Sequence, residues 1–191
     1  EQTLLFNRMS DTIIQSLGYM PIRHVLNTAG IVRHSEYQYE MVRLGLGLYG
    51  FDSSKILQDK LQPIGTFISI ISQVKILKSG DSVSYNRSGK VKNNTVIATI
   101  PIGYADGLPR NAGNGKWKVW IDGQLAPTIG NICMDMTMID ITGLNDIYEG
   151  TEVEIFGQHL SVDDLAKVCD TISYEILTRI SYRVKRIFYQ E

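Results

Sequence analysis

The first fifty residues alternate between helical and extended patterns. A helix is indicated by four apolar side chains that recur at every fourth position, and these are Leu5, Met9, Ile13 and Leu17. Gly18 is a natural place for this helix to end. The apolar runs 22–27 and 41–51 predict strands, and residues 29–34 predict a short helix between them. Strand, helix and strand joined by short links are typical of parallel βα units.

From about Leu61 the pattern changes to short β-rich runs, which glycine and Asp-Gly turns separate. The runs are residues 67–77, 91–101, 117–121, 136–141 and 152–156. The pair Asp122-Gly123 lies between two β-rich segments and predicts a hairpin. Ser161, followed three residues later by Asp164, predicts the capped start of a helix.

These patterns predict a fold of the mixed α/β and β class. Residues 1–55 form the α/β part, residues 56–191 form a C-terminal β domain, and the linker falls near residues 52–62. The chain has 191 residues, of which 43% are hydrophobic. That is enough to bury a core in one domain, or in a domain plus part of another.

Composition narrows the classes of function. The net charge is −1 and no basic patch stands out, so we expect no nucleic-acid partner. The longest apolar stretch is far too short to cross a membrane, and no signal peptide is recognisable. Cys133 and Cys169 do not make a disulfide framework and favour a reducing, cytoplasmic compartment. The sequence begins at Glu1 without a methionine, and we therefore expect the chain to be a fragment.

Two segments of the first region are candidates for chemistry. In Asn27-Thr28-Ala29-Gly30 a predicted strand ends and a helix begins, so backbone N–H groups and a hydroxyl could bind a phosphate there. The alternative is a simple N-cap threonine. Arg43 lies in an apolar, glycine-containing run, where a charge is costly without a partner and where glycine lets a flat ligand approach. The alternative is an arginine that faces solvent at a strand end.

Three segments of the second region are also candidates. The loop 101–107 directly follows an apolar strand and presents Tyr104. Tyr85 has no local feature that separates it from a packing tyrosine. Residues 130–136 carry a thiol, a thioether and a carboxylate in succession, yet no second cysteine or histidine lies at ligand spacing, so we expect no metal. The histidines are scattered and are expected to be structural; they are His24, His34 and His159.

Taken together, six blocks of the sequence resemble alanine racemases, and they occur in that family's order over almost the whole chain. The blocks are Asn-Thr-Ala at 27–29, Met-Val-Arg-Leu-Gly-Leu-Gly-Leu-Tyr-Gly at 41–50, Val-Ser-Tyr at 83–85, Pro-Ile-Gly-Tyr-Ala-Asp-Gly at 101–107, Ile-Cys-Met-Asp-Met at 132–136 and Ile-Ser-Tyr-Glu-Ile at 172–176. The resemblance implies that residues 1–55 are the last βα units of a TIM-type barrel, followed by the C-terminal β domain. It also implies pyridoxal 5′-phosphate (PLP) as the cofactor.

The resemblance assigns cofactor-binding residues in both regions. It implies that Arg43 donates to the pyridine nitrogen of PLP. A guanidinium does not give up its proton, so this contact keeps the ring nitrogen neutral and restrains side reactions. Thr28 is implied to bind the cofactor phosphate together with the backbone of Gly45 and Leu46. Tyr174 is implied to contact the phosphate and to narrow the entrance.

The resemblance also assigns the reacting groups. Tyr85 matches the family's base on one face of the substrate α-carbon, and racemisation needs a second proton-transfer group on the opposite face. In the family the second group is the PLP lysine of a Lys-Ala-Asn-Ala-Tyr-Gly motif, which these 191 residues do not contain. Tyr104 is implied to line the substrate entrance, and Met134 and Asp135 to meet the substrate carboxylate. Two positions depart from the family's pattern: Asn86 replaces a usual glycine, and Asn131 stands in a usual Gly-Arg pair.

The resemblance therefore predicts an enzyme that interconverts L- and D-alanine, supplies D-alanine for peptidoglycan and acts as a homodimer with composite active sites. The chain alone is expected to be inactive, because the attachment lysine is not in it. The alternatives are a racemase for another small amino acid, a PLP barrel enzyme such as a decarboxylase, and a non-catalytic β domain used for assembly. The Gly-Tyr-Ala-Asp-Gly and Val-Arg-Leu-Gly motifs argue against the decarboxylase. Fusion to a peptidoglycan ligase stays open.

Overall fold

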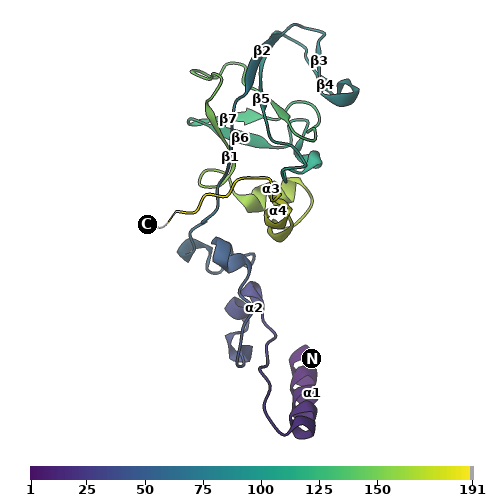
Figure 1. Cartoon of the computed structure of the whole chain (residues 1–191), viewed down its shortest axis with the longest axis vertical. Coiled ribbons are helices and arrows are strands. Elements are labelled where there is room, and N and C mark those ends of the chain that lie inside the picture. Colours follow the sequence, from purple (N-terminus) through teal and green to yellow (C-terminus); the bar gives the residue numbers. More distant parts are fainter. Residues whose placement is uncertain (190–191) are drawn as a thin grey trace. The chain divides into compact units, whose positions relative to one another are not determined.

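The computed structural model describes residues 1–189, which fall into two compact units (Figure 1). Unit 1 comprises residues 1–64, and unit 2 begins at Gly65. No helix among the described residues has the length and apolar character that a membrane crossing requires.

Unit 1 begins with the amphipathic helix α1 (Gln2–Leu17), as the sequence predicts. The helix ends where Gly18 takes the left-handed conformation, with φ 73°, and its N–H donates to the Ile14 carbonyl at 2.9 Å. A residue without a Cβ adopts this conformation at little cost, which is why the helix ends here. The apolar face of α1 stays exposed: Leu5, Met9, Ile13 and Leu17 each leave between 48% and 57% of their surface accessible.

The rest of unit 1 contains short helices. The predicted helix 29–34 is confirmed as α2 (Thr28–Arg33), and the Asn27 side chain caps it by accepting from the Gly30 N–H at 3.0 Å. The 3₁₀ turns η1 (Ser35–Tyr37), η2 (Leu46–Tyr49) and η3 (Gln58–Lys60) follow.

The prediction of strands at 22–27 and 41–51 is wrong, because neither run forms a strand in this structure. Within residues 1–189 the two runs form a single isolated parallel β-bridge, between Asn27 and Arg43, beside the backbone bonds from the Met41 N–H to the Arg23 carbonyl and from the Arg43 N–H to the Leu26 carbonyl. A strand buried in a parallel sheet needs neighbours on both edges, and these few contacts between the two runs do not amount to a strand ladder in the described chain. The direction of the bridge is nevertheless parallel, as βα units require.

Unit 2 is built from antiparallel sheets. One sheet has the order β1-β9-β6-β7, a second has the order β2-β5-β8, and β3 pairs with β4. The strands are β1 (Phe67–Ile70), β2 (Gln73–Leu77), β3 (Ser82–Val83), β4 (Gly89–Lys90), β5 (Thr95–Ile100), β6 (Lys118–Ile121), β7 (Gln124–Pro127), β8 (Thr137–Asp140) and β9 (Glu152–Phe156). Every β-rich run expected from the sequence therefore contains a strand.

The core of unit 2 lies where the strands present buried apolar side chains. Ala98 of β5 pairs with Ile139 of β8, and both are fully buried. Val119 in β6 and Val153 in β9 are equally inaccessible. The indole Nε1 of Trp117 donates to the Ile155 carbonyl at 3.0 Å, so this aromatic side chain is buried with its polar atom satisfied.

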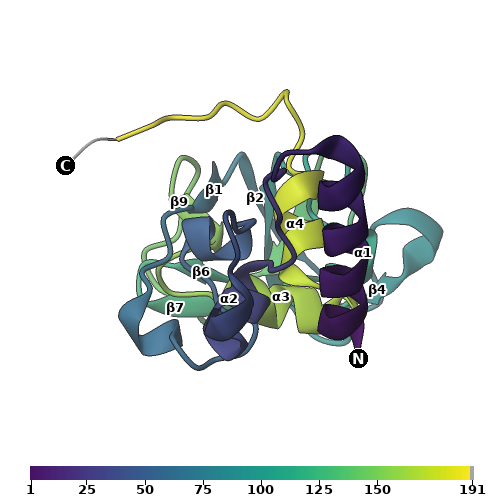
Figure 2. The same ribbon diagram turned by 90° about the horizontal axis from the view of Figure 1, so that it is seen from below.

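The predicted hairpin and the predicted helix after Ser161 are confirmed, and a second C-terminal helix, which was not predicted, follows. Asp122 and Gly123 connect β6 to β7 with φ values of 42° and 81°, as the favoured two-residue hairpin turn requires. Ser161 caps α3 (Val162–Val168) by accepting from the Asp163 N–H at 3.1 Å, whereas the Asp164 carboxylate pairs with the Lys167 ammonium. Helix α4 (Ser173–Arg179) lies beside α3 in both orientations of the ribbon (Figures 1 and 2).

Candidate functional site

In unit 1, the Thr28 hydroxyl organises the turn that follows the Asn27–Arg43 bridge. Thr28 is buried, and its Oγ1 accepts from the backbone N–H of Gly45 at 3.1 Å and of Gly47 at 3.2 Å. A Cβ at Gly47 would lie 3.0 Å from Thr28 Cγ2 and 2.9 Å from the Leu44 side chain. Glycine at 47 therefore lets the turn close over the hydroxyl. These contacts bring Thr28, Gly45 and Leu46 into one neighbourhood.

Arg43 lies in the same neighbourhood through the parallel bridge. Its side chain is exposed, and Nη1 donates to His24 Nδ1 at 3.0 Å. A guanidinium has no acceptor, so Nδ1 of the imidazole must accept. The guanidinium is therefore solvated, as the alternative interpretation expects, and it is also hydrogen-bonded to a histidine that is expected from the sequence to be only structural. Its spacing of 19 residues from Arg43 gives no local signal.

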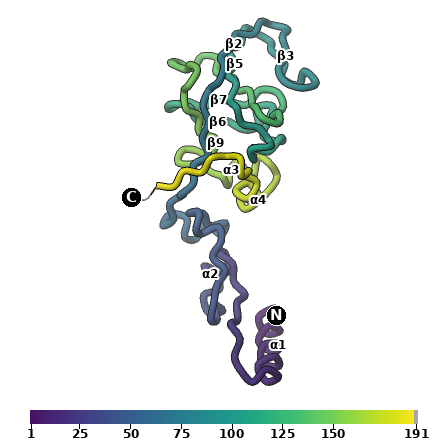
Figure 3. Tube along the Cα trace, viewed as in Figure 1, coloured from purple at the N-terminus to yellow at the C-terminus, as the bar shows by residue number. Residues whose placement is uncertain are grey.

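In unit 2, Tyr85 lies on the 3₁₀ turn η4 (Tyr85–Arg87), which connects β3 to β4. This segment projects from the end of β2, as the chain trace shows (Figure 3). The Tyr85 side chain is 70% exposed, so its phenol is accessible on the surface of this segment. Asn86, which replaces the family's usual glycine, has φ 57° and ψ 21°. Glycine adopts this conformation freely and asparagine tolerates it better than most residues, which accounts for the exchange.

Tyr104 lies on the loop after β5, which is fastened to the loop 130–136. The Tyr104 N–H donates to the Cys133 carbonyl and the Ala105 N–H to the Met134 carbonyl, both at 3.0 Å. A Cβ at Gly103 would lie within 2.3 Å of both carbonyl oxygens, so only glycine permits this approach. The fastening holds Tyr104 and Met134 on adjacent backbone segments, and both side chains are partly exposed.

Arg183 ties the same two loops together electrostatically. Its Nε donates to Asp106 Oδ1 at 2.8 Å and its Nη2 to Asp135 Oδ1 at 2.6 Å. These carboxylates raise the pKa of the Arg183 guanidinium above its ordinary value. Asp106 Oδ2 also accepts from the Gly103 N–H, which fixes the buried carboxylate. The negative charge of Asp135 is thereby balanced at the point where a substrate carboxylate is expected.

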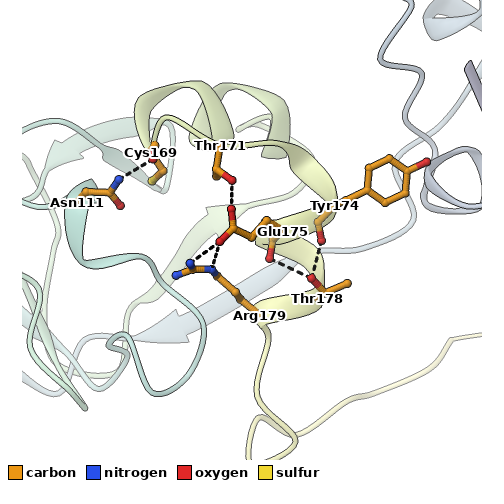
Figure 4. A network of polar contacts seen from close by, with 7 residues as sticks. All are labelled: Asn111, Cys169, Thr171, Tyr174, Glu175, Thr178 and Arg179. Atoms are coloured by element: carbon orange, nitrogen blue, oxygen red, sulfur yellow. Dashed lines mark hydrogen bonds and ion pairs between the residues drawn. The ribbon is translucent and has the colours of Figure 1, made fainter.

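Helix α4 presents Tyr174, whose ring points away from the polar cluster on the neighbouring turn (Figure 4). In that cluster Glu175 accepts from the Thr171 hydroxyl and pairs with Arg179, whose Nε lies 2.9 Å from Glu175 Oε1. The Thr178 hydroxyl donates to the Tyr174 carbonyl at 2.8 Å. These contacts fix the helix that carries Tyr174.

The expected residues therefore form two groups. Unit 1 holds four of them, namely Thr28, Arg43, Gly45 and Leu46. Unit 2 holds the other five, namely Tyr85, Tyr104, Met134, Asp135 and Tyr174. Sequence reasoning missed Arg183 and the role of Asn131, because each acts on residues more than forty positions away and neither has a local motif. Residues 1–189 contain no group of three histidine, cysteine or acidic side chains placed to hold a metal.

Comparison with known proteins gives the same two-part division. A family model described as "Alanine racemase, N-terminal domain" matches residues 1–53, and one described as "Alanine racemase, C-terminal domain" matches residues 64–188. The chain is 42% identical over 174 residues to alanine racemase 1 of Clostridium acetobutylicum; this match covers 87% of the chain and 45% of the relative.

Solved structures show the same likeness in three dimensions. Alanine racemase of Clostridium difficile in complex with cycloserine matches with a TM-score of 0.85 and 37% identity, over 96% of this chain and 49% of that one. Alanine racemase of Bartonella henselae with covalently bound pyridoxal phosphate matches with a TM-score of 0.82 and 31% identity, over 96% and 52%. The predicted fold class, the end of a TIM-type barrel followed by a β domain, is confirmed. The chain spans about half the length of the curated relatives it matches.

Proposed function

Because this chain belongs to the alanine racemase family, we propose that it forms the C-terminal half of a PLP-dependent enzyme that interconverts L- and D-alanine and supplies D-alanine for peptidoglycan. The observation that carries the proposal is the ordered match to both family domains, together with the fastened loops that hold Tyr104, Met134 and Asp135 near one another. The two cysteines are free and buried, which supports a reducing, cytoplasmic location for the enzyme.

The residues of unit 1 fit PLP. Its phosphate needs hydrogen-bond donors. Thr28 Oγ1 accepts from the N–H groups of Gly45 and Gly47, and its own O–H can donate to a phosphate. Its ring nitrogen needs one donor, and Arg43 offers a permanently protonated guanidinium. We propose that Thr28, the backbone of Gly45 and Leu46, Arg43 and Tyr174 hold the cofactor. When bound, PLP supplies the electron sink that lets an amino acid lose its α-proton.

The residues of unit 2 would act on the substrate. Tyr85 is proposed to transfer a proton at one face of the substrate α-carbon through its phenol oxygen. Tyr104 would narrow the approach, and Met134 and Asp135 would meet the substrate carboxylate. Asp135 alone would repel that carboxylate, but its pairing with Arg183 at 2.6 Å offsets the repulsion.

The exposed face of α1 supports the proposal that unit 1 is part of a larger barrel. Leu5 and Met9 leave more than half of their surface accessible, and an apolar stripe of this kind is expected to be covered in a finished barrel. The proton-transfer group for the opposite face would be the lysine that attaches PLP, outside these 191 residues. The projecting Tyr85 segment supports a composite site, in which unit 2 of one subunit reaches the barrel of the other.

A racemase assay tests this function. The full-length protein that contains this chain is incubated with PLP and L-alanine, and the products are separated by chiral chromatography. Formation of D-alanine that requires PLP is the expected result. Absence of D-alanine from folded, PLP-loaded protein contradicts the proposal. Faster turnover of serine or another small amino acid than of alanine would redirect it to that substrate.

A further inference from the structure

We propose that Asn131 is a positioning residue for Tyr85, an inference that rests on the proposed function. Asn131 lies in the loop 130–136, 46 positions after Tyr85 in the sequence. It contacts the backbone of the turn that carries the phenol. Its role is to hold that backbone in a conformation that the turn does not favour by itself.

The turn around Tyr85 is conformationally demanding. Ser84, Asn86 and Arg87 have φ values of 69°, 57° and 50°, which place three of four successive residues in a region that side chains with a Cβ seldom adopt. The turn's own hydrogen bonds are long, at 3.2 Å from the Arg87 N–H to the Ser84 carbonyl and 3.3 Å from the Ser88 N–H to the Tyr85 carbonyl. A backbone of this kind persists only where surrounding structure holds it.

Packing does not fix the Tyr85 ring. The side chain is 70% exposed, so the place of the phenol follows from the backbone to which it is attached. An error of about 1 Å in the position of a reacting group can cost about a hundredfold in rate. Whatever holds this backbone therefore controls the proposed proton transfer.

Asn131 holds the turn at three points. Its side-chain Nδ2 donates to the Tyr85 carbonyl at 3.2 Å, its carbonyl accepts from the Ser84 hydroxyl at 2.7 Å, and its N–H donates to the Ser88 hydroxyl at 3.0 Å. These bonds bracket the demanding residues on both sides.

The orientation of the Asn131 amide follows from its partners. The Tyr85 carbonyl can only accept, so Asn131 must turn its Nδ2 toward it. The Asn131 Oδ1 then accepts from Asn114 Nδ2 at 2.9 Å. An aspartate at 131 would keep the acceptor for Asn114 but would set a carboxylate oxygen against the Tyr85 carbonyl. The substitution Asn131→Asp therefore removes the bond to the Tyr85 carbonyl and keeps the bond from Asn114.

The two loops also meet backbone to backbone next to this contact. A Cβ added at Gly130 would lie 2.7 Å from Ser84 Cβ and 2.9 Å from the Val83 carbonyl oxygen. A displacement of residue 131 would therefore displace the Tyr85 turn, because the two backbones are tightly packed.

The test is Asn131→Asp in the full-length enzyme. Turnover should fall about tenfold while the KM for alanine stays within about twofold, because the phenol is displaced and the substrate-binding loops are not. The primary deuterium isotope effect is measured separately with α-deuterated L-alanine and α-deuterated D-alanine. Since Tyr85 would serve one face only, the isotope effect should rise with one enantiomer and not with the other.

Two variants serve as matched controls. Asn114→Ala removes the outer contact of the Asn131 amide and leaves its bond to Tyr85, and Asn94→Asp adds the same charge at an exposed position of unit 2. Both should keep wild-type turnover and isotope effects. Ser84→Ala removes a different bond between the same loops and should reproduce the one-sided isotope effect, which keeps the inference testable if Asn131→Asp does not fold.

The outcomes separate the two proposals. If wild-type enzyme forms no D-alanine, the proposed function fails. If wild-type enzyme racemises alanine but Asn131→Asp and Ser84→Ala leave the isotope effects unchanged, or raise them equally for both enantiomers, the positioning role fails and Asn131 serves stability alone.

Discussion

The two units of this chain bury their apolar side chains to different degrees. In unit 2, Ile139 and Val153 are completely inaccessible, each within a paired antiparallel strand. In unit 1, the apolar face of α1 is open, and Ile13 at its centre is 48% exposed. The difference teaches that unit 2 obtains its stability from its own core. Unit 1 instead has an apolar surface that contributes to stability only where another surface covers it.

The comparison is sharpest in a pair of isoleucine exchanges. Ile139→Ala in this chain should lower the free energy of unfolding of unit 2 by about 3 kcal/mol, because a fully buried side chain leaves a cavity. Ile13→Ala should change stability by less than about 0.5 kcal/mol, since the side chain is half exposed and alanine favours the helix. Urea denaturation followed by circular dichroism and tryptophan fluorescence measures both. Equal losses of unfolding free energy in the two variants would contradict the difference between the two units.

A buried carboxylate in unit 2 gives the next largest effect. Glu154 accepts from the His159 N–H at 2.8 Å and the Leu160 N–H at 3.0 Å, and its side chain is 8% exposed. Glu154→Ala leaves these donors without their acceptor and should cost about 2 kcal/mol of unfolding free energy. Glu152→Ala, on the same strand but exposed, is the control and should be near neutral. Similar losses in both variants would show that strand β9 is sensitive for another reason.

Unit 1 relies more on surface polar contacts, which predicts a small dependence on pH. The Arg23 guanidinium donates to both oxygens of Glu40 and lowers the pKa of that carboxyl to about 2. A lowered carboxyl pKa stabilises the folded state above the ordinary value of about 4.5, and this contribution is lost as the pH falls towards about 2. Glu40→Gln should remove this dependence between about pH 4.5 and pH 2. Amide exchange near Met41, compared at pH 5 and pH 3, measures it; an unchanged pH dependence in the variant would contradict the assignment.

The same difference explains which predictions from the sequence succeeded. The strands of unit 2 pair within the chain, so the β-rich run at 152–156 and the turn at Asp122-Gly123 formed as predicted. The apolar runs at 22–27 and 41–51 have the composition of parallel strands, but strand formation depends on neighbours, and within residues 1–189 they form a single β-bridge with each other. The local sequence pattern indicates the propensity of a run to form a strand, but a strand also needs a neighbouring strand with which to pair.

The candidate site divides in the same way. Tyr85 and Tyr104 were found because they lie in family blocks. The three hydrogen bonds between Asn131 and the Tyr85 turn join residues more than forty positions apart, so no local sequence pattern predicts them. The ion pairs of Arg183 with Asp106 and Asp135 are equally remote in the sequence. Positions that hold a site together are therefore harder to predict than positions that present its chemistry.

We propose that unit 2 brings Tyr85 to a composite racemase site. The direct measurement mixes full-length Tyr85→Phe subunits with full-length subunits that lack the PLP lysine, after each variant alone has been shown to be inactive. If Tyr85 serves the partner's cofactor, each mixed dimer contains one intact site, and D-alanine formation returns. If mixed dimers form and no activity returns, Tyr85 acts within its own chain or is not the base, and the claim is contradicted.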